Sequence, residues 1–271
     1  MDLGNGEQKI FIWIDFSKET EVVILHGVQV AMILNKEICL IGSPAVKNGT
    51  VEEAESRLRS LTLPISKILG TGRVHYLITL LPLQSILTEM AEEYDALLLV
   101  AHKKNSKELL KQLPHSGFPF LFVSAKQNMD LSYRKIAVPI GYMKKSKDLA
   151  LWSSYFARHN GGKVTILKTI EMFGEDNRMV MSNLFSVERL FRNFQFPYEV
   201  VECHTPTWKI QKMALEHALG FQQGVLIISF TYSSSFIDRL FKINDAYVIA
   251  HSEDLSVMCI NSQRDLYTFC S

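Results

Sequence analysis

The chain contains one opening pattern twice, at a fixed spacing. The apolar run Lys9–Phe16 leads through a turn and a helical stretch to a second apolar run at Ile38–Ile41. The run Lys135–Tyr142 leads in the same way to Val164–Leu167. The two segments align at one offset of 126 residues without a gap. A repeat of this length predicts two copies of a domain-sized unit, so each functional feature can be sought in both copies.

Length and charge agree with this organisation. A chain of 271 residues exceeds the usual size of one domain, and 47% hydrophobic residues suffice for a core in each half. The net charge of +1 gives no overall field that would attract nucleic acid or an acidic membrane surface. We therefore expect neither as a partner.

No segment has the pattern of a signal peptide or a membrane span. The first seven residues lack a basic region followed by an apolar one. The longest uncharged stretch, Val74–Leu87, contains His75 and Pro82 and is too short to cross a bilayer. These features predict a soluble, cytoplasmic protein.

Ten short runs have the composition of buried strands. Each is rich in Ile, Val, Leu and Phe and is largely continuous rather than alternating, which is typical of parallel strands covered by helices on both faces. The expected strands are Ile10–Asp15, Glu37–Gly42, Val74–Thr79, Ala96–Ala101, Phe118–Ser124, Lys135–Ile140, Lys163–Lys168, Tyr198–Cys203, Val225–Phe230 and Leu255–Ile260.

Amphipathic stretches alternate with these runs, which predicts an α/β fold of two tandem, doubly wound, five-stranded parallel sheets. The polar segment Lys126–Tyr133 is the expected linker, so the copies span residues 1–125 and 134–271. The expected helices are Glu19–Asn35, Val51–Leu69, Leu83–Tyr94, Lys147–Arg158, Met179–Phe194, Thr207–Gln222 and Phe236–Ala250.

This order of elements, with Asp15 closing the first strand, resembles the universal stress protein family. The resemblance covers nearly the whole chain and is carried mainly by Lys9–Ser17, Lys135–Ile140, Lys163–Lys168 and Gly224–Ile260. It implies the adenine nucleotide alpha hydrolase-like fold. Family members that bind ATP have an acidic residue ending strand one and, after strand four, Gly-x2-Gly-x9-Gly followed by Ser or Thr. Glycines there let backbone N–H groups approach the phosphates.

Neither copy keeps this signature complete. In copy one, Asp15 is present, but the segment Ala101–Glu108 after the fourth strand contains no glycine and the distance to the fifth strand is short. In copy two, Gly141 stands at the acidic position, and the loop Ser229–Asp238 has aromatic residues where glycine is needed. The resemblance therefore implies degenerate nucleotide-binding sites and no bound cofactor.

The candidate ligand-binding residues lie after the strands, where open α/β sheets bind ligands. Asp15 is either a ribose- or base-orienting residue or a carboxylate that caps the start of the first helix at Ser17–Glu19. His102 and Lys103, with Lys104 and Lys107, are either an anion site or a solvated charge run. The hydroxyls of Thr231, Ser233, Ser234 and Ser235 either donate hydrogen bonds to a phosphate or a small polar ligand, or belong to a helix start with its N-cap at Ser234 or Ser235.

No motif supports catalysis or a metal site. The chain has no GxSxG sequence, no P-loop and no HExxH, and its histidines show no i, i+4 pair. The four cysteines, Cys39, Cys203, Cys259 and Cys270, are far apart, and three lie in strand-like runs, which favours buried thiols over redox or metal roles. We expect no catalytic residue and no metal ligand.

These features predict a non-enzymatic protein of the universal stress type that has lost ATP binding. It would act in a stress response through a protein partner or a remodelled small-ligand cleft. The alternative is a regulatory protein that still binds ATP or AMP through copy one, and a weaker alternative is a nucleotide-dependent enzyme of related fold.

The resemblance also implies how the copies associate. Separate family members commonly pair their fifth strands, so the fused copies should form an intramolecular pseudo-dimer through Phe118–Val123 and Leu255–Ile260. The whole chain would then be a monomer or a homodimer.

Overall fold

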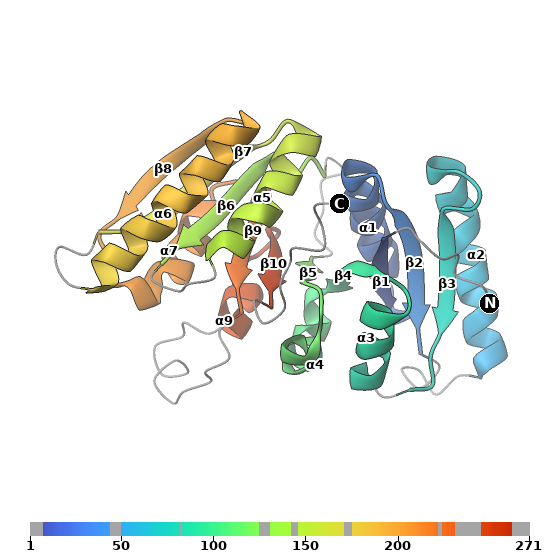
Figure 1. Ribbon diagram of the computed structural model, residues 1–271. Helices are drawn as coiled ribbons and strands as arrows, with labels where there is room; N and C mark the ends of the chain where they lie inside the picture. The colour runs from blue at the N-terminus through green and yellow to red at the C-terminus, as the bar shows by residue number, and fades with distance from the viewer. Residues whose placement is uncertain are drawn as a thin grey trace. The chain divides into compact units, whose positions relative to one another are not determined.

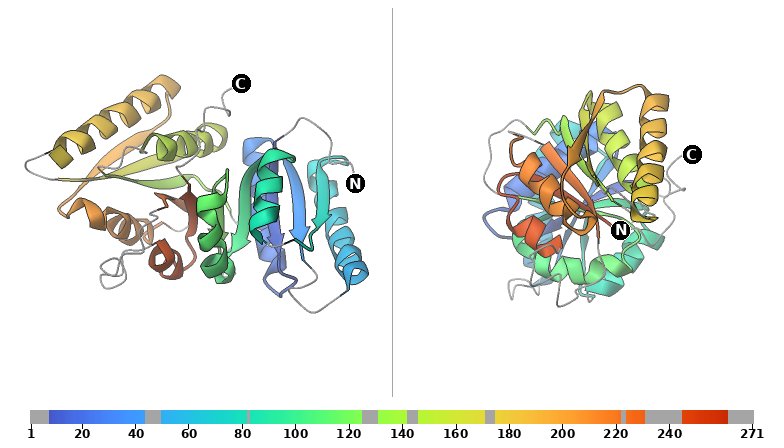
Figure 2. Two further views of the ribbon diagram at one scale, coloured as in Figure 1. Left: turned by 60° about the horizontal axis from the view of Figure 1, so that its bottom comes forward. Right: turned by 90° about the vertical axis from the view of Figure 1, so that its left-hand side faces the viewer.

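The computed structural model describes residues 8–43, 50–81, 83–124, 131–141, 146–170, 175–221, 224–230 and 245–261. The chain divides into two compact units, Met1–Gln127 (unit 1) and Asn128–Ser271 (unit 2). Each unit is an α/β structure with helices on both faces of a parallel sheet (Figures 1 and 2).

The sheet of unit 1 has the strand order β3-β2-β1-β4-β5, and all its pairings are parallel. The central strands β1, β2 and β4 are almost wholly buried, which explains their continuous apolar sequences. β3 lies at the edge and is half-buried throughout. The strands are β1 (Lys9–Ile14), β2 (Glu37–Gly42), β3 (Val74–Ile78), β4 (Ala96–His102) and β5 (Phe120–Val123).

Two helices cover each face of this sheet. α1 packs on β1, β2 and β4 and contacts α2, which covers β2 and β3. α3 packs on β4 and contacts α4. The placement follows from right-handed crossovers, which reverse face where the chain passes from β3 back to β4. The helices are α1 (Thr20–Leu34), α2 (Val51–Leu69), α3 (Leu83–Glu92) and α4 (Ser106–Gln112), with the 3-10 turns η2 (Lys103–Asn105) and η3 (Leu113–His115) beside α4.

Unit 2 repeats this topology, with the order β10-β9-β6-β7-β8 and parallel pairings throughout. α5 and α6 contact each other on one face, and α7 contacts α9 on the other. The strands are β6 (Lys135–Ile140), β7 (Lys163–Thr169), β8 (Tyr198–Cys203), β9 (Gly224–Ser229) and β10 (Ser256–Ile260). The helices are α5 (Ser146–Asn160), α6 (Glu175–Phe194), α7 (Ile210–Ala218) and α9 (Asp245–Ala250), with η4 (Thr207–Lys209) before α7.

The two units have the same register between their first two strands. Lys9 of β1 lies beside Glu37 of β2, and Lys135 of β6 lies beside Lys163 of β7. Both members of the second pair are numbered 126 higher than those of the first, the offset at which the sequence segments align. Residues that are 126 apart in the sequence therefore occupy the same positions in the first two strands of the two units.

The expected strands are confirmed, with ends that shift by two residues at most. The main difference is in unit 1, where the segment after β4 forms η2 and the short helix α4, which was not among the expected helices. Leu109 and Leu110 of α4 are buried and anchor it. Part of the expected helix Phe236–Ala250 lies outside the described residues, and its last six residues form α9.

Three cysteines are free thiols and buried, namely Cys39 in β2, Cys203 in β8 and Cys259 in β10. Burial raises the pKa of each thiol. Cys270 lies outside the described residues. Within the described part of the chain, no helix is both long enough and apolar enough to cross a membrane.

Candidate functional site

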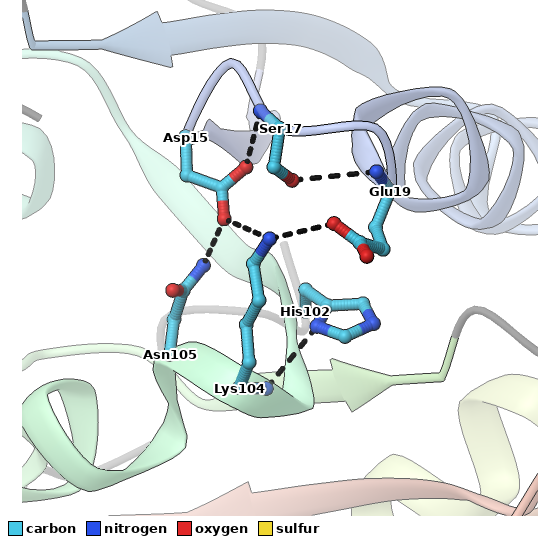
Figure 3. Close-up of polar contacts among 6 residues, drawn as sticks. All are labelled: Asp15, Ser17, Glu19, His102, Lys104 and Asn105. Carbon is cyan, nitrogen blue, oxygen red and sulfur yellow. Dashed lines mark hydrogen bonds and ion pairs between the residues drawn. The ribbon is translucent and has the colours of Figure 1, made fainter. Parts of the chain in front are cut away.

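The carboxyl ends of β1 and β4 meet at one edge of unit 1, because the two strands are parallel neighbours. Asp15 directly follows β1, and His102 is the last residue of β4. The turn η2 then brings Lys104 and Asn105 back toward Asp15 (Figure 3). The sheet thus brings together two predicted site residues that are far apart in the sequence.

The carboxylate of Asp15 is bound on both oxygens by its own chain. Oδ1 accepts a hydrogen bond from the backbone N–H of Ser17 at 3.0 Å. Oδ2 accepts one from Nδ2 of Asn105 at 3.1 Å and lies 3.0 Å from Nζ of Lys104 (Figure 3). Asp15 therefore stabilises the turn before α1 and ties that turn to the segment after β4. The N-cap residue of α1 is Glu19, which has no side-chain cap hydrogen bond.

Lys104 bridges two carboxylates. Its Nζ lies 2.7 Å from Oε2 of Glu19 as well as 3.0 Å from Asp15. Glu19 is held in turn by the bond from its backbone N–H to Oγ of Ser17, at 3.3 Å. We call Asp15, Ser17, Glu19, Lys104 and Asn105 the Asp15 clasp. Its polar groups form hydrogen bonds and ion pairs with one another.

The clasp lowers the pKa of both carboxyl groups. Burial by itself would raise the pKa of Asp15, but hydrogen bonds from Ser17, Asn105 and Lys104 outweigh it and lower the pKa to about 2. The hydrogen bonds from Lys104 and Ser17 lower the pKa of Glu19 to about 2. Burial by itself would lower the pKa of Lys104, but the carboxylates of Glu19 and Asp15 outweigh it and raise this pKa. All three groups are charged at neutral pH, and the clasp carries one net negative charge.

His102 is a hydrogen-bond acceptor in this arrangement. Its Nδ1 accepts from the backbone N–H of Lys104 at 3.2 Å, which caps η2. Burial, followed by the charge of Lys104, lowers the pKa of His102. The neighbouring His26 in α1 is buried, and burial with the charges of Lys103 and His102 lowers its pKa to about 3. Both imidazoles are therefore neutral near pH 7, which weakens the expected anion site.

In unit 2, a methyl group fills the space that corresponds to the Asp15 side chain. Gly141 follows β6 as Asp15 follows β1. A Cβ atom added to Gly141 would lie 2.9 Å from Cγ2 of Thr207 and 3.7 Å from Cγ2 of Ile210. Thr207 is itself buried. Glycine is needed here for close packing under η4, and no acidic side chain fits without a shift of Thr207.

Uncharged polar groups surround this position. Oγ1 of Thr169 lies 3.3 Å from Oγ1 of Thr207, and Nδ2 of Asn183 donates to the carbonyl of Gly141 at 2.8 Å. Nε2 of Gln211 donates to the carbonyl of Ser229 at 2.8 Å, while its buried Oε1 accepts no hydrogen bond from a described residue. These described polar groups are all uncharged.

The remaining predicted site residues are placed as follows. Lys103 begins η2, next to the clasp, whereas Thr231, Ser233 and Ser234 lie outside the described residues. Among the residues that are described, no group of three His, Cys, Asp or Glu side chains could hold a metal ion.

Sequence reasoning missed the roles of Glu19 and Asn105. Glu19 belongs to an alternating series, Asp15, Ser17 and Glu19, just before a helix, which is a detectable signal of linked turns. Asn105 gave no such signal, because it meets Asp15 only through the pairing of β1 with β4.

Comparison with solved structures supports the fold. A universal stress protein from Archaeoglobus fulgidus matches with a TM-score of 0.64 and 14% identity, over 96% of this chain and 98% of that one. A protein of unknown function from Pseudomonas aeruginosa matches with a TM-score of 0.63 and 12% identity, over 94% and 92% of the two chains. No protein-family model and no curated protein sequence matches. This protein therefore has the universal stress protein fold, as the sequence resemblance predicted.

Proposed function

We propose that this chain is a non-enzymatic protein of the universal stress type that does not bind ATP and acts in a stress response through a protein partner or a remodelled cleft. The fold supports the general type, because it matches that of the Archaeoglobus fulgidus universal stress protein along nearly the whole chain.

The observation that carries the loss of ATP binding is the Asp15 clasp. Both oxygens of Asp15 are engaged by Ser17, Asn105 and Lys104, so a ribose hydroxyl would have to displace one of them. After β4 the backbone enters η2 and α4, where side chains with a Cβ replace the glycines that a phosphate loop needs.

Electrostatics in unit 1 also oppose a triphosphate. Lys104 is neutralised by Asp15 and Glu19, and the lowered pKa of His102 keeps its imidazole uncharged at neutral pH. Lys103 and Lys107 lie in the same segment, in η2 and α4. In unit 2, Thr207 fills the space at Gly141, which leaves no room there for the acidic side chain.

The alternative function is regulation by a nucleotide bound in unit 1, with Asp15 freed from Lys104 when the ligand binds. It is favoured only by the position of Asp15 and the lysines at the carboxyl ends of β1 and β4. A nucleotide-dependent enzyme is a weaker candidate, because no group in the clasp is an activated nucleophile.

Thermal unfolding in the presence of ATP, AMP and magnesium tests the proposal. A ligand at 100 times its dissociation constant would add about 2.7 kcal/mol to the free energy of unfolding. We expect no change in melting temperature at millimolar ATP. A sub-micromolar dissociation constant for ATP by calorimetry would contradict the proposal.

Two lysine variants separate the alternatives. If ATP stabilises the wild type and Lys104→Met abolishes the effect while Lys107→Met does not, the nucleotide-regulated alternative is correct. Lys107 is a suitable control because it is exposed, lies in α4 and forms no ion pair with a described residue.

A further inference from the structure

α2 of unit 1 and α6 of unit 2 occupy equivalent positions, and the three buried residues of α2 have buried counterparts in α6. Ala54, Leu58 and Ile65 of α2 are buried against the sheet. The residues numbered 126 higher in α6, Val180, Leu184 and Phe191, are buried as well. The same offset therefore also relates the exposed positions of the two helices.

At two exposed positions the helices differ in chemistry. Glu55 and Arg59 of α2 are exposed and polar, as expected for a solvated helix face. Their counterparts in α6 are Met181 and Phe185, whose exposed fractions are 48% and 61%. Since the equivalent helix does without apolar residues here, the fold does not require Met181 and Phe185.

Met181 and Phe185 lie side by side on the flank of α6 that faces β8. They are four residues apart and therefore adjacent on one side of the helix. Glu188 marks this flank, because it accepts a hydrogen bond from the hydroxyl of Tyr198 in β8 at 3.5 Å. β8 is an edge strand that pairs with β7 alone in its unit, so the flank is not covered by a further strand (Figure 1).

Arginines border the apolar pair at both ends. Arg178 lies one turn before Met181, and Arg189 lies one turn after Phe185. Both are exposed, and neither forms an ion pair with a described residue. Arg192, in the next turn, is 4.0 Å from its helical neighbour Glu188. We call Arg178, Met181, Phe185 and Arg189 the α6 stripe.

We propose that the α6 stripe binds an acidic segment of another protein that inserts an apolar side chain against Met181 and Phe185. The inference rests on the proposed function, which acts through a protein partner. Charge complementarity selects the partner: Arg178 and Arg189 are free to pair with carboxylates, and guanidinium groups suit bidentate pairing. The two arginines are about 16 Å apart along the helix, which sets the spacing of the carboxylates in the partner.

A membrane surface fits the stripe less well. α6 buries its main apolar face, including Val180, Leu184 and Phe191, against the sheet. Among the described side chains of α6, the exposed large apolar residues are Met181 and Phe185 and, at the end of the helix, Phe194, which lies under the guanidinium group of Arg158 at 4.0 Å. Helices that bind membranes instead bury a whole apolar face among the lipids. A small apolar centre with a charged rim is instead the usual anatomy of a protein interface.

Selection from a peptide library tests the proposal on the full chain. Random 16-residue peptides displayed on phage are selected on the wild type, and the most enriched sequence is synthesised with a fluorescent label. We expect enriched peptides to combine Asp or Glu with Leu, Ile or Phe. The absence of enrichment, or enrichment of peptides without acidic residues, would overturn the proposal.

Variants that copy the chemistry of unit 1 then locate the binding site. Met181→Glu with Phe185→Arg installs the residues that α2 carries at the equivalent positions, so the fold should tolerate them. We expect this double variant to weaken binding of the labelled peptide by at least about 30-fold. Arg178→Ala with Arg189→Ala should weaken it by about 10-fold and reduce its dependence on salt. Unchanged binding to either double variant would refute the site.

Controls separate the remaining explanations. Leu63→Arg changes an apolar residue of α2 that is 67% exposed, and it should leave binding unchanged. Binding to phosphatidylserine vesicles that requires Met181 and Phe185, without binding to any selected peptide, would replace the proposed partner with a membrane. ATP binding is measured separately, so a failed peptide selection refutes the α6 stripe alone, and ATP binding refutes the proposed function alone.

Discussion

Asp15 shows how the surroundings of a residue decide its role. Its position after a buried strand was predictable, because the run Lys9–Ile14 has an unmistakable apolar sequence. Its partners were not, because Lys104 and Asn105 come close only when β1 pairs with β4. The sequence left orientation of a ribose and capping of the first helix open, and the observed hydrogen bond from Ser17 to Asp15 lies in the turn before that helix.

The first prediction concerns acid stability and Asp15→Asn. The pKa of Asp15 is about 2 in the folded protein, below its ordinary value of 3.8. Its stabilising contribution is therefore fully present above about pH 4 and is lost as the pH falls toward 2. We expect Asp15→Asn to reduce the free energy of unfolding by about 2 kcal/mol at pH 7 and by little at pH 2. Denaturant unfolding at several pH values measures this difference.

The control is Glu108→Gln, which removes an exposed carboxylate of α4 that forms no ion pair with a described residue. If the difference between Asp15→Asn and the wild type stayed constant from pH 7 to pH 2, the clasp would not stabilise the ionised carboxylate.

The second prediction concerns the packing at Gly141. A Cβ at this position meets Cγ2 of Thr207 at 2.9 Å, so Gly141→Ala should destabilise the protein by about 1–3 kcal/mol. Thr207→Ser removes that methyl group and keeps the hydroxyl that contacts Thr169. In the double variant the cost of Gly141→Ala should largely disappear, and a double-mutant cycle of melting curves measures the coupling. Additive effects would mean that the methyl group is not what excludes a side chain.

At the scale of elements, burial decided which parts of the fold could be predicted. β2, β6, β8 and α2 have the bounds that the sequence predicts, because their apolar patterns match one period clearly. α4 was missed because it is seven residues long and has only two apolar positions, Leu109 and Leu110. No helix was therefore expected between β4 and β5, and the contacts that η2 brings to Asp15 were not predicted.

The third prediction concerns the start of α2. The hydroxyl of Thr50 accepts from the backbone N–H of Glu53 at 3.2 Å, and the Glu53 carboxylate accepts from the backbone N–H of Thr50 at 3.2 Å. Thr50→Ala removes one half of this capping box and should reduce the free energy of unfolding by about 1 kcal/mol. Thr50→Ser retains the hydroxyl and should restore the stability in thermal melts. Equal losses in both variants would show that the hydroxyl is not responsible.

At the scale of the molecule, the predicted pairing of Phe118–Val123 with Leu255–Ile260 stays a prediction. A charged substitution within β10, such as Val257→Lys, would not test this pairing. Val257 is fully buried and lies beside Leu226 of β9, so a lysine there would disrupt unit 2 itself. A change outside both sheets is needed.

The fourth prediction uses a protease site inserted between Gln127 and Asn128, at the boundary of the two units. If the fifth strands pair, their association should survive the cut, because each strand covers an apolar edge of the other. We expect the two fragments to elute together from a size-exclusion column under native conditions and separately in denaturant. Separate native peaks would show that the units are joined only by the chain.

The buried cysteines allow local unfolding of each unit to be measured by thiol alkylation. Thiol reagents attack the thiolate, and burial both shields Cys39, Cys203 and Cys259 and raises their pKa. Cys39 and Cys259 have no exposed surface, so their alkylation under native conditions requires the surrounding strands to separate. Cys39 lies in unit 1 and the other two in unit 2, so mass spectrometry of the alkylated peptides would give a separate opening rate for each unit, with no introduced label.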